Sequence, residues 1–313
     1  MRSSAILLLV VPLALACAPA AALAAAPPAA SAVAWWVWPL ALFLVTFLIG
    51  IAAVLAGVGG GVLFVPIVSG LFPFHLDFVR STGLLLALAG ALSAGPSLLT
   101  SGMASLRLAL PFALIGSVFS MVGALVSFQV PADVMQATLG ITIALIVLLM
   151  WRSGGTEPPA GGASDRIAAA LGLAGGYFDS VSGRDVDWRV QHTAAGFAAF
   201  AVIGLVGGMF GLGAGWANVP ALNLLLGVPL KGAVATSSIV MSVVNTSAAW
   251  IYIERGAVLP MIVTPSVIGI MLGARIGARL LHRLPAAVLR RIVIVILMLA
   301  GSRALLTGFG LWN

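Results

Sequence analysis

Charge is scarce in this sequence. Only 7% of its 313 residues are Asp, Glu, Lys or Arg, whereas 62% are hydrophobic. An ordinary soluble domain carries about 25% charged residues. The shortage excludes a soluble globular protein and predicts an integral membrane protein with long apolar helices. Cysteine is also rare: the single Cys17 excludes a disulfide framework within the chain.

Clusters of metal-binding, basic or buried acidic residues are missing as well. His75, His192 and His282 lie at the edges of apolar runs without metal-ligand spacing, so we expect neither a metal nor another cofactor. The net charge is +7, but the basic residues are dispersed and cannot follow a phosphate backbone, which excludes nucleic acid. None of the eight acidic residues lies inside a long apolar run. The usual intramembrane proton or sodium relay therefore has no visible carrier.

The N-terminus has the order of a secretory signal peptide, with Arg2, an apolar run over residues 5–16 and small residues through Ala26. We expect residues 1–26 to be a signal peptide; an uncleaved first helix is the alternative. Residues 35–151 and 191–313 are predicted to form two transmembrane units. Residues 152–190 are expected to be a cytoplasmic linker, with a weak helical pattern from Asp165 to Phe178.

The second half repeats the first at a constant offset of 154 residues, without a gap. Over residues 57–131 the halves share 15 identities in 75 positions, and more than half of these are Gly or Pro, which fix backbone geometry. Each half has four long apolar runs and one short run. The long runs are 38–56, 79–99, 108–128 and 134–151, then 193–210, 232–253, 258–280 and 288–309; the short runs are 62–72 and 216–226.

Basic residues orient the two halves, because Lys and Arg favour cytoplasmic loops. Arg80 and Arg255 disagree with the pattern but are single charges that carry little weight. The loop before the last long run has no base in the first half, whereas its partner in the second half carries Arg279, Arg283, Arg290 and Arg291. Equivalent loops therefore face opposite sides. This places the N-terminus outside and the linker in the cytoplasm.

The predicted fold is an all-α, multi-pass protein of the cytoplasmic membrane, built from two inverted-topology repeats. Each repeat has four long helices and a short helix broken by glycine. Inverted topology requires an odd number of membrane crossings in each repeat, whereas four long helices give an even number. The short helix must therefore change this count. It does so either as a re-entrant hairpin or as a half-helix that forms a thin fifth crossing.

Two glycine motifs, GVGGGVLFVP and GLGAGWANVP, stand at corresponding positions of the halves. A helix start presents unpaired N–H groups and a positive dipole end, which suit an anion. Broken helices at corresponding positions are typical of a transporter's binding site. The alternative is that the glycines only allow close helix packing. The candidate binding residues are Gly57, Gly59, Gly60, Gly61 and Pro66 in the first motif and Gly211, Gly213, Gly215, Asn218 and Pro220 in the second.

Hydroxyl side chains follow each motif proline at the same distance, near the start of the next long run. They could donate to an oxyanion, or they could serve as helix caps and contacts between helices. These hydroxyls belong to Ser81, Thr82, Thr236 and Ser237. Three further side chains occur only in the second half and are candidates for substrate selection: Trp216, Asn218 and Asn245.

With these motifs, the chain resembles the sulfite exporter TauE/SafE family of membrane permeases. The resemblance rests on the paired glycine–proline motifs, on Ala235-Thr236-Ser237 and on the two-half arrangement. It implies movement of sulfite or organosulfonate anions across the cytoplasmic membrane. The sequence departs from the family's second motif at Ala214, where Gly is usual.

We therefore expect a permease, with no catalytic residues, that exports a small sulfur oxyanion driven by the membrane potential. Its expected partners are the small anionic substrate and the lipid bilayer, and the sequence leaves a homo-oligomer open. Alternatives are an uptake transporter or channel for another small solute, an intramembrane hydrolase and a structural subunit. The hydrolase would need a nucleophile and a base on facing helices, and the sequence has no G-x-S-x-G motif.

Overall fold

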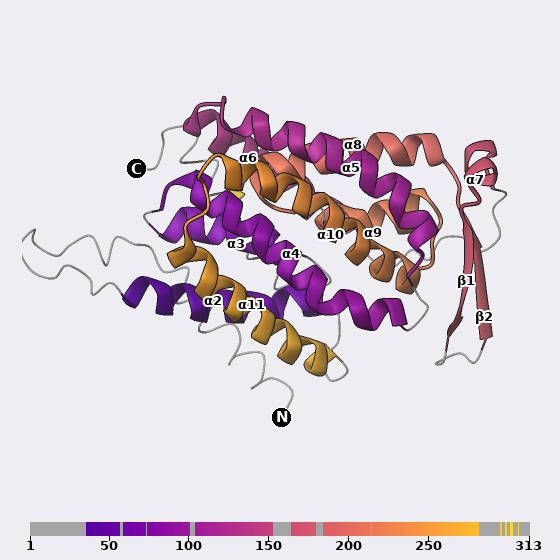
Figure 1. Cartoon of the computed structure of the whole chain (residues 1–313), viewed down its shortest axis with the longest axis horizontal. Coiled ribbons are helices and arrows are strands. Elements are labelled where there is room, and N and C mark those ends of the chain that lie inside the picture. The colour runs from indigo at the N-terminus through magenta and orange to yellow at the C-terminus, as the bar shows by residue number, and fades with distance from the viewer. Residues whose placement is uncertain are drawn as a thin grey trace, which may run out of the picture.

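The computed structural model describes residues 36–56, 59–72, 74–100, 104–152, 164–179, 184–213 and 215–281, together with residues 295, 298, 301, 302 and 306. This part of the chain is mostly helical (Figure 1). The predicted signal peptide lies outside the described residues. So does most of the last apolar run.

Each apolar run in the described part forms a helix close to its predicted bounds. The first half contains α2 (Val37–Ala56), α3 (Gly60–Leu71), α4 (Leu76–Thr100), α5 (Leu106–Ser127) and α6 (Ala132–Arg152). The second contains α8 (Thr193–Phe210), α9 (Gly215–Pro220), the π-helix η2 (Ala221–Leu225), α10 (Leu230–Glu254) and α11 (Pro260–Leu281). Helices α4, α5, α8 and α10 are long and apolar enough to cross a membrane, and shorter apolar stretches lie in α2, α3, α6 and α11.

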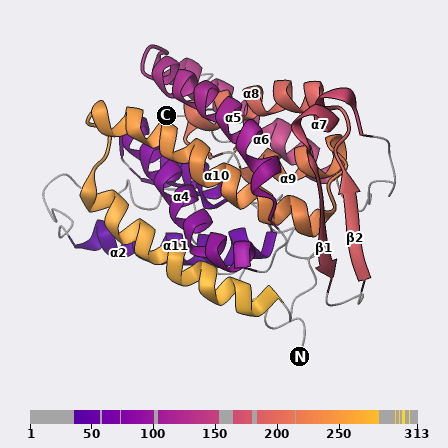
Figure 2. The ribbon, with the colours of Figure 1, turned by 45° about the vertical axis from the view of Figure 1, so that its right-hand side comes forward.

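Helices α4 and α10 pack against each other in the middle of the molecule, between two outer pairs (Figures 1 and 2). One outer pair is α2 with α11 and the other is α5 with α8. Each pair therefore joins a helix of the first half to one of the second. Glycines make both contacts close: Gly204 of α8 lies on the backbone of Gly116 in α5, and Gly273 of α11 lies on the backbone of α2.

The short helices fold back along the helices that precede them. The ring of Trp38, at the start of α2, lies 5.8 Å from the rings of Phe72 and Phe74, just after α3. In the second half, the backbone N–H of Gln191, just before α8, donates to the carbonyl of Leu226, just after η2 (3.1 Å). Helices α2–α3 and α8–α9–η2 are therefore hairpins, each of which ends where it began.

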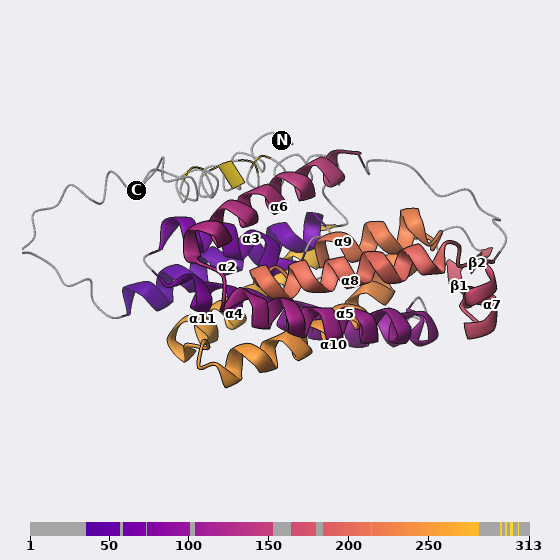
Figure 3. The same ribbon diagram turned by 90° about the horizontal axis from the view of Figure 1, so that it is seen from above.

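The linker between the halves corrects part of the sequence prediction. Helix α7 (Arg166–Leu171) ends at Gly172, whose φ of 62° is the left-handed conformation typical of a helix C-terminus. The predicted helical pattern through Phe178 is wrong beyond Leu171, because β1 (Ala174–Asp179) follows and pairs antiparallel with β2 (Arg184–Arg189). Glycines at positions 172, 175 and 176 disfavour a longer helix. The strands project beyond the helices at one end (Figure 3).

Asp165 anchors this linker to the second half. Its carboxylate accepts hydrogen bonds from the backbone N–H of Ala168 (2.9 Å), and from the N–H (2.8 Å) and hydroxyl (2.7 Å) of Thr193. Desolvation acts to raise the pKa of Asp165, but these hydrogen bonds outweigh it and lower the pKa from its ordinary value. The contact fixes α7 to the first turn of α8.

Candidate functional site

The two glycine motifs meet inside the molecule. Gly59 precedes the first turn of α3, and Gly215 begins α9. A Cβ atom added to Gly215 would lie 3.2 Å from the backbone nitrogen of Gly59 and 2.7 Å from the Cε atom of Met241 on α10. At Gly215 the absence of a side chain lets the two hairpins approach this closely. The starts of both short helices therefore share one location.

The turn between α8 and α9 depends on glycine for its backbone conformation. Gly211 and Gly213 have φ values of 69° and 70°, which strain any residue with a Cβ atom. The backbone of Gly211 packs on the backbone of Arg80 in α4. A Cβ atom at Gly213 would lie 2.7 Å from the Cβ atom of Ala87 and 3.2 Å from the side-chain nitrogen of Asn245.

The other described glycines of the first motif are also closely packed. A Cβ atom at Gly61 would lie 2.6 Å from the carbonyl oxygen of Gly83, and one at Gly60 would meet the side chain of Ile270. Pro66 lies inside α3. Helix α9 ends at Pro220, and the chain continues as the π-helix η2. Gly57 lies outside the described residues.

Asn218 and Asn245 are the most unusual side chains of this region. Both are fully buried, and neither amide nitrogen nor amide oxygen has a hydrogen-bond partner among the described residues. Asn245 lies against Gly213, and Asn218 follows Gly215 by one helical turn. A buried polar group without a partner costs about 1–3 kcal/mol. Two such amides, one against the glycine turn and one on the helix that follows it, therefore suit a polar ligand that would complete their hydrogen bonds.

A third buried asparagine shows the contrast. The amide nitrogen of Asn223, in η2, donates to the carbonyl of Val228 (2.8 Å) and so fixes the end of the short helix. Ser117, Ser120 and Ser266 are also buried without a partner among the described residues. A serine hydroxyl on a helix can rotate and donate to a carbonyl of the preceding turn. Asn218 and Asn245 have no such local partner among the described residues.

In the first half, the predicted hydroxyl donors are engaged in this conformation. Thr82 donates to the carbonyl of Phe78 (2.7 Å), and Ser81 donates to the carbonyl of Ala257 (2.6 Å). Both side chains are buried in α4. Their hydroxyl protons are therefore held by the protein.

In the second half, Thr236 and Ser237 lie buried on α10. The hydroxyl oxygen of Thr236 accepts a hydrogen bond from the backbone N–H of Ser105 (3.2 Å), just before α5. The hydroxyl thus ties α10 to the first turn of α5. Trp216, the other candidate for selection, is the second residue of α9.

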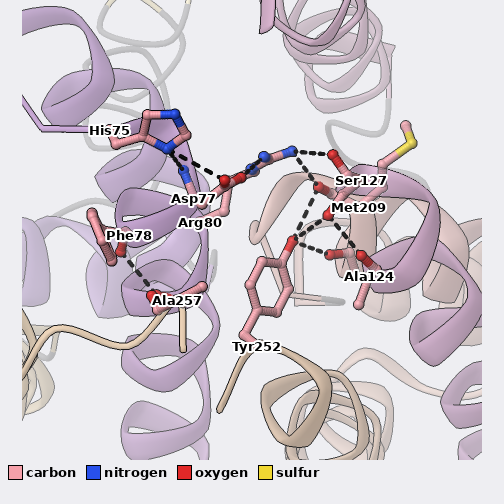
Figure 4. Close-up of polar contacts among 11 residues, drawn as sticks. His75, Asp77, Phe78, Arg80, Ala124, Ser127, Met209, Tyr252 and Ala257 are labelled. Atoms are coloured by element: carbon pink, nitrogen blue, oxygen red, sulfur yellow. Dashed lines mark hydrogen bonds and ion pairs between the residues drawn. The ribbon is translucent and has the colours of Figure 1, made fainter. Parts of the chain in front are cut away.

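A second polar cluster, the Arg80 cluster, consists of Asp77, Arg80, Ser127 and Tyr252 (Figure 4). The guanidinium of Arg80 forms an ion pair with Asp77 and lies 3.4 Å from the carbonyl oxygen of Ser127 and 3.5 Å from that of Met209. The Tyr252 hydroxyl lies 3.0 Å from the Gly208 carbonyl oxygen and 3.1 Å from the Ser127 hydroxyl.

The Arg80 cluster occupies the C-terminal ends of α5 and α8, where helix carbonyls lack partners within the helix and the dipole favours a cation. Arg80 is only 4% exposed. In the sequence Arg80 is only a single charge at odds with the predicted topology, and its burial was not predicted. The spacing of Asp77 and Arg80, three residues apart, is the signal that could have indicated an ion pair on one helix face.

Charged residues are few around the point where the two glycine motifs meet, in the part of the chain that the structure describes. Helices α3 and α9 carry no charged residue. On α4 the charges are Asp77 and Arg80, which pair with each other. On α10 they are Lys231 and Glu254, near its opposite ends. No group of three or more His, Cys, Asp or Glu side chains that could hold a metal occurs among the described residues.

Comparison with known proteins identifies the family. The family model for the sulfite exporter TauE/SafE matches residues 42–304. The chain is 26% identical to "Probable membrane transporter protein YunE" of Bacillus subtilis (strain 168), over 83% of this chain and 94% of that protein. It is also 26% identical to "Probable membrane transporter protein ORF9" of Sinorhizobium sp, over 84% of this chain and 91% of that protein. No solved structure matches. The chain belongs to the sulfite exporter TauE/SafE family and is a multi-pass membrane transporter.

Proposed function

We propose that this transporter exports a small sulfur oxyanion, such as sulfite or an organosulfonate, across the cytoplasmic membrane. One observation carries the proposal: the buried amides of Asn218 and Asn245 have no partner in the described structure, Asn245 lies against Gly213, and Asn218 lies on α9, one helical turn after Gly215. An oxyanion would accept hydrogen bonds from both amide nitrogens and from the N–H groups at the start of α3. Such a carrier needs neither a catalytic residue nor a cofactor.

The proposed architecture is an inverted repeat. Two observations support it: α2–α3 and α8–α9–η2 are both hairpins, and α11 packs on α2 as its repeat partner α5 packs on α8. We propose that the hairpins enter the membrane from opposite sides and meet near its middle. The first enters from outside and the second from the cytoplasm, where the linker lies. Rocking of one half against the other would then expose the site to each side in turn.

The proposed driving force is the membrane potential. Potential favours exit of each negative charge by about 2.3 kcal/mol per 100 mV. Helices α3 and α9 carry no acidic side chain, Asp77 on α4 is paired with Arg80, and the acidic residue of α10, Glu254, is its last. A carrier of this kind needs no proton or sodium ion bound beside the substrate.

Purified protein in liposomes with an imposed potassium diffusion potential tests this function. Sulfite and sulfonate flux should follow the sign and size of the potential and should exceed the flux in empty liposomes. Flux that ignores the potential but follows a pH gradient would overturn the coupling. Absence of flux for sulfite, sulfonates and sulfate would overturn the substrate class.

A further inference from the structure

The site differs from many anion sites in offering dipoles without a positive side chain. We infer that it takes a singly charged anion, such as bisulfite or an alkyl sulfonate, and rejects the sulfite and sulfate dianions. This inference rests on the proposed function and adds the charge state of the substrate.

The available donors are neutral. Asn218 and Asn245 each carry an unpartnered amide group, and α3 presents N–H groups of its first turn, which begins at Gly60; of these, the N–H of Val62 donates to the carbonyl of Gly59 (3.1 Å). No charged residue lies on α3 or α9. The compensation that the site offers to an anion therefore comes from fixed dipoles.

Fixed dipoles favour a single charge over a double one. The attraction between an ion and a set of fixed dipoles grows in proportion to the ion's charge. The Born cost of removing the ion from water grows with the square of that charge, so it is about four times larger for a dianion than for a monoanion of the same size. A neutral, buried site that holds a monoanion therefore falls short for a dianion.

The charged groups on neighbouring elements do not change this balance. Helix α4 contributes Asp77 and Arg80, which form an ion pair with no net charge. Helix α10 contributes Lys231 near its first turn and Glu254 at its last residue. Helix α11 approaches α3 through Ile270, which lies beside Gly60. Its residue Arg275 is exposed. Among the side chains that the structure describes on these elements, the buried cation is Arg80, and it is paired with Asp77.

Apolar groups complete the surroundings. The methyl end of Met241 approaches both Gly59 and Gly215, and the Cβ atom of Ala87 approaches Gly213. An anion with one polar head and one apolar end matches amides on one side and methyl groups on the other. Methanesulfonate has this shape and remains a monoanion across the neutral pH range, which makes it the probe of choice.

The test compares sulfite, methanesulfonate and sulfate in the same proteoliposomes, at one fixed potential and with equal pH on both sides. Sulfite converts from monoanion to dianion as the pH rises through neutrality. The readout is the ratio of sulfite flux to methanesulfonate flux at each pH, because any titration of the protein affects both substrates. We expect this ratio to fall by up to about tenfold per pH unit at the alkaline end, and sulfate flux to remain at background.

A second readout is the potential at which net flux of methanesulfonate reverses. For a tenfold gradient, one charge per molecule shifts that potential by about 59 mV and two charges by about half as much. We expect the larger shift for methanesulfonate and for sulfite. A sulfite-to-methanesulfonate ratio that stays constant or rises with pH, or sulfate flux equal to methanesulfonate flux, would overturn the inference while the proposed function stands. Absence of flux for all three anions would overturn the proposed function itself.

Discussion

Two buried polar regions contact the same turn between α8 and α9, and they differ in how many of their polar groups have hydrogen-bond partners. The backbone of Arg80 packs on Gly211, and the side chains of the Arg80 cluster bind one another and the carbonyls at two helix ends. Asn245 packs on Gly213, yet its amide and that of Asn218 have no partner in the described structure. The turn thus lies between a polar cluster whose groups mostly have partners, with Arg80 Nε as the exception, and two amides that have none in the described structure.

The difference indicates different roles. A filled cluster lowers the free energy of the folded state and fixes the end of α8 in place. An unfilled pair of amides raises that free energy, by about 1–3 kcal/mol for each group. Residues that destabilise the empty protein fit a ligand site, whereas residues that stabilise it fit a scaffold. Variants of each region should therefore separate stability from transport.

The largest expected effect is on the Arg80 cluster. Arg80→Met removes the ion-pair partner of the half-buried Asp77 and a donor to the carbonyl of Ser127, and we expect the free energy of unfolding to fall by about 3 kcal/mol. Thermal unfolding in detergent measures this change. The double variant Asp77→Leu with Arg80→Met removes both charges and should recover part of the loss. An Arg80→Met protein that unfolds at the wild-type temperature would show that the cluster is not a scaffold.

A smaller loss of stability is expected from substitutions in the two glycine motifs, and it should differ between them. Gly213→Ala places a Cβ atom at a φ of 70° and against Ala87, whereas Gly59→Ala meets only the flexible end of Met241. We expect the first substitution to cost about 1–3 kcal/mol. Its flux per reconstituted molecule should fall well below that of Gly59→Ala in the same liposomes. Equal flux in the two variants would contradict the role assigned to the turn.

The smallest effect is expected at Asp165, whose carboxylate is hydrogen-bonded and lies outside the long apolar helices. Asp165→Ala removes the cap of α7 and the contact with Thr193 and should cost about 1 kcal/mol at neutral pH. The folded-state pKa of Asp165 lies below the ordinary value of 3.8, so the carboxylate stabilises the protein above that value. The difference between wild type and variant should therefore shrink as the pH falls through the folded-state pKa. A difference that grows in acid would contradict this assignment.

Apolar run length and glycine position predicted most of the helices. The runs are long enough to specify helices without tertiary information, and the second short helix begins at Gly215, one residue before the predicted start at Trp216. The linker strands were missed because the pattern from Asp165 to Phe178 lacks a marked period. Their pairing depends on contacts with residues 184–189 that lie farther along the chain.

The candidate site was predictable in its backbone and less so in its side chains. Glycines in repeat register marked the meeting point, and Asn218 and Asn245 were marked by their absence from the first half. Whether an amide has a partner depends on neighbours from other helices, which no sequence pattern specifies. The same holds for Arg80, whose burial requires the ends of α5 and α8.

The most direct test of the central claim is methanesulfonate flux in the double variant Asn218→Leu with Asn245→Leu, beside Asn223→Leu as a matched control. Removing unpartnered amides should leave the unfolding temperature unchanged or raise it. Flux per molecule should fall about 10- to 100-fold or more, because a hydrogen bond to a charged group contributes about 1.5–3 kcal/mol. Asn223→Leu should show the reverse, lower stability with flux per folded molecule retained. Wild-type flux in a well-reconstituted double variant would contradict the account.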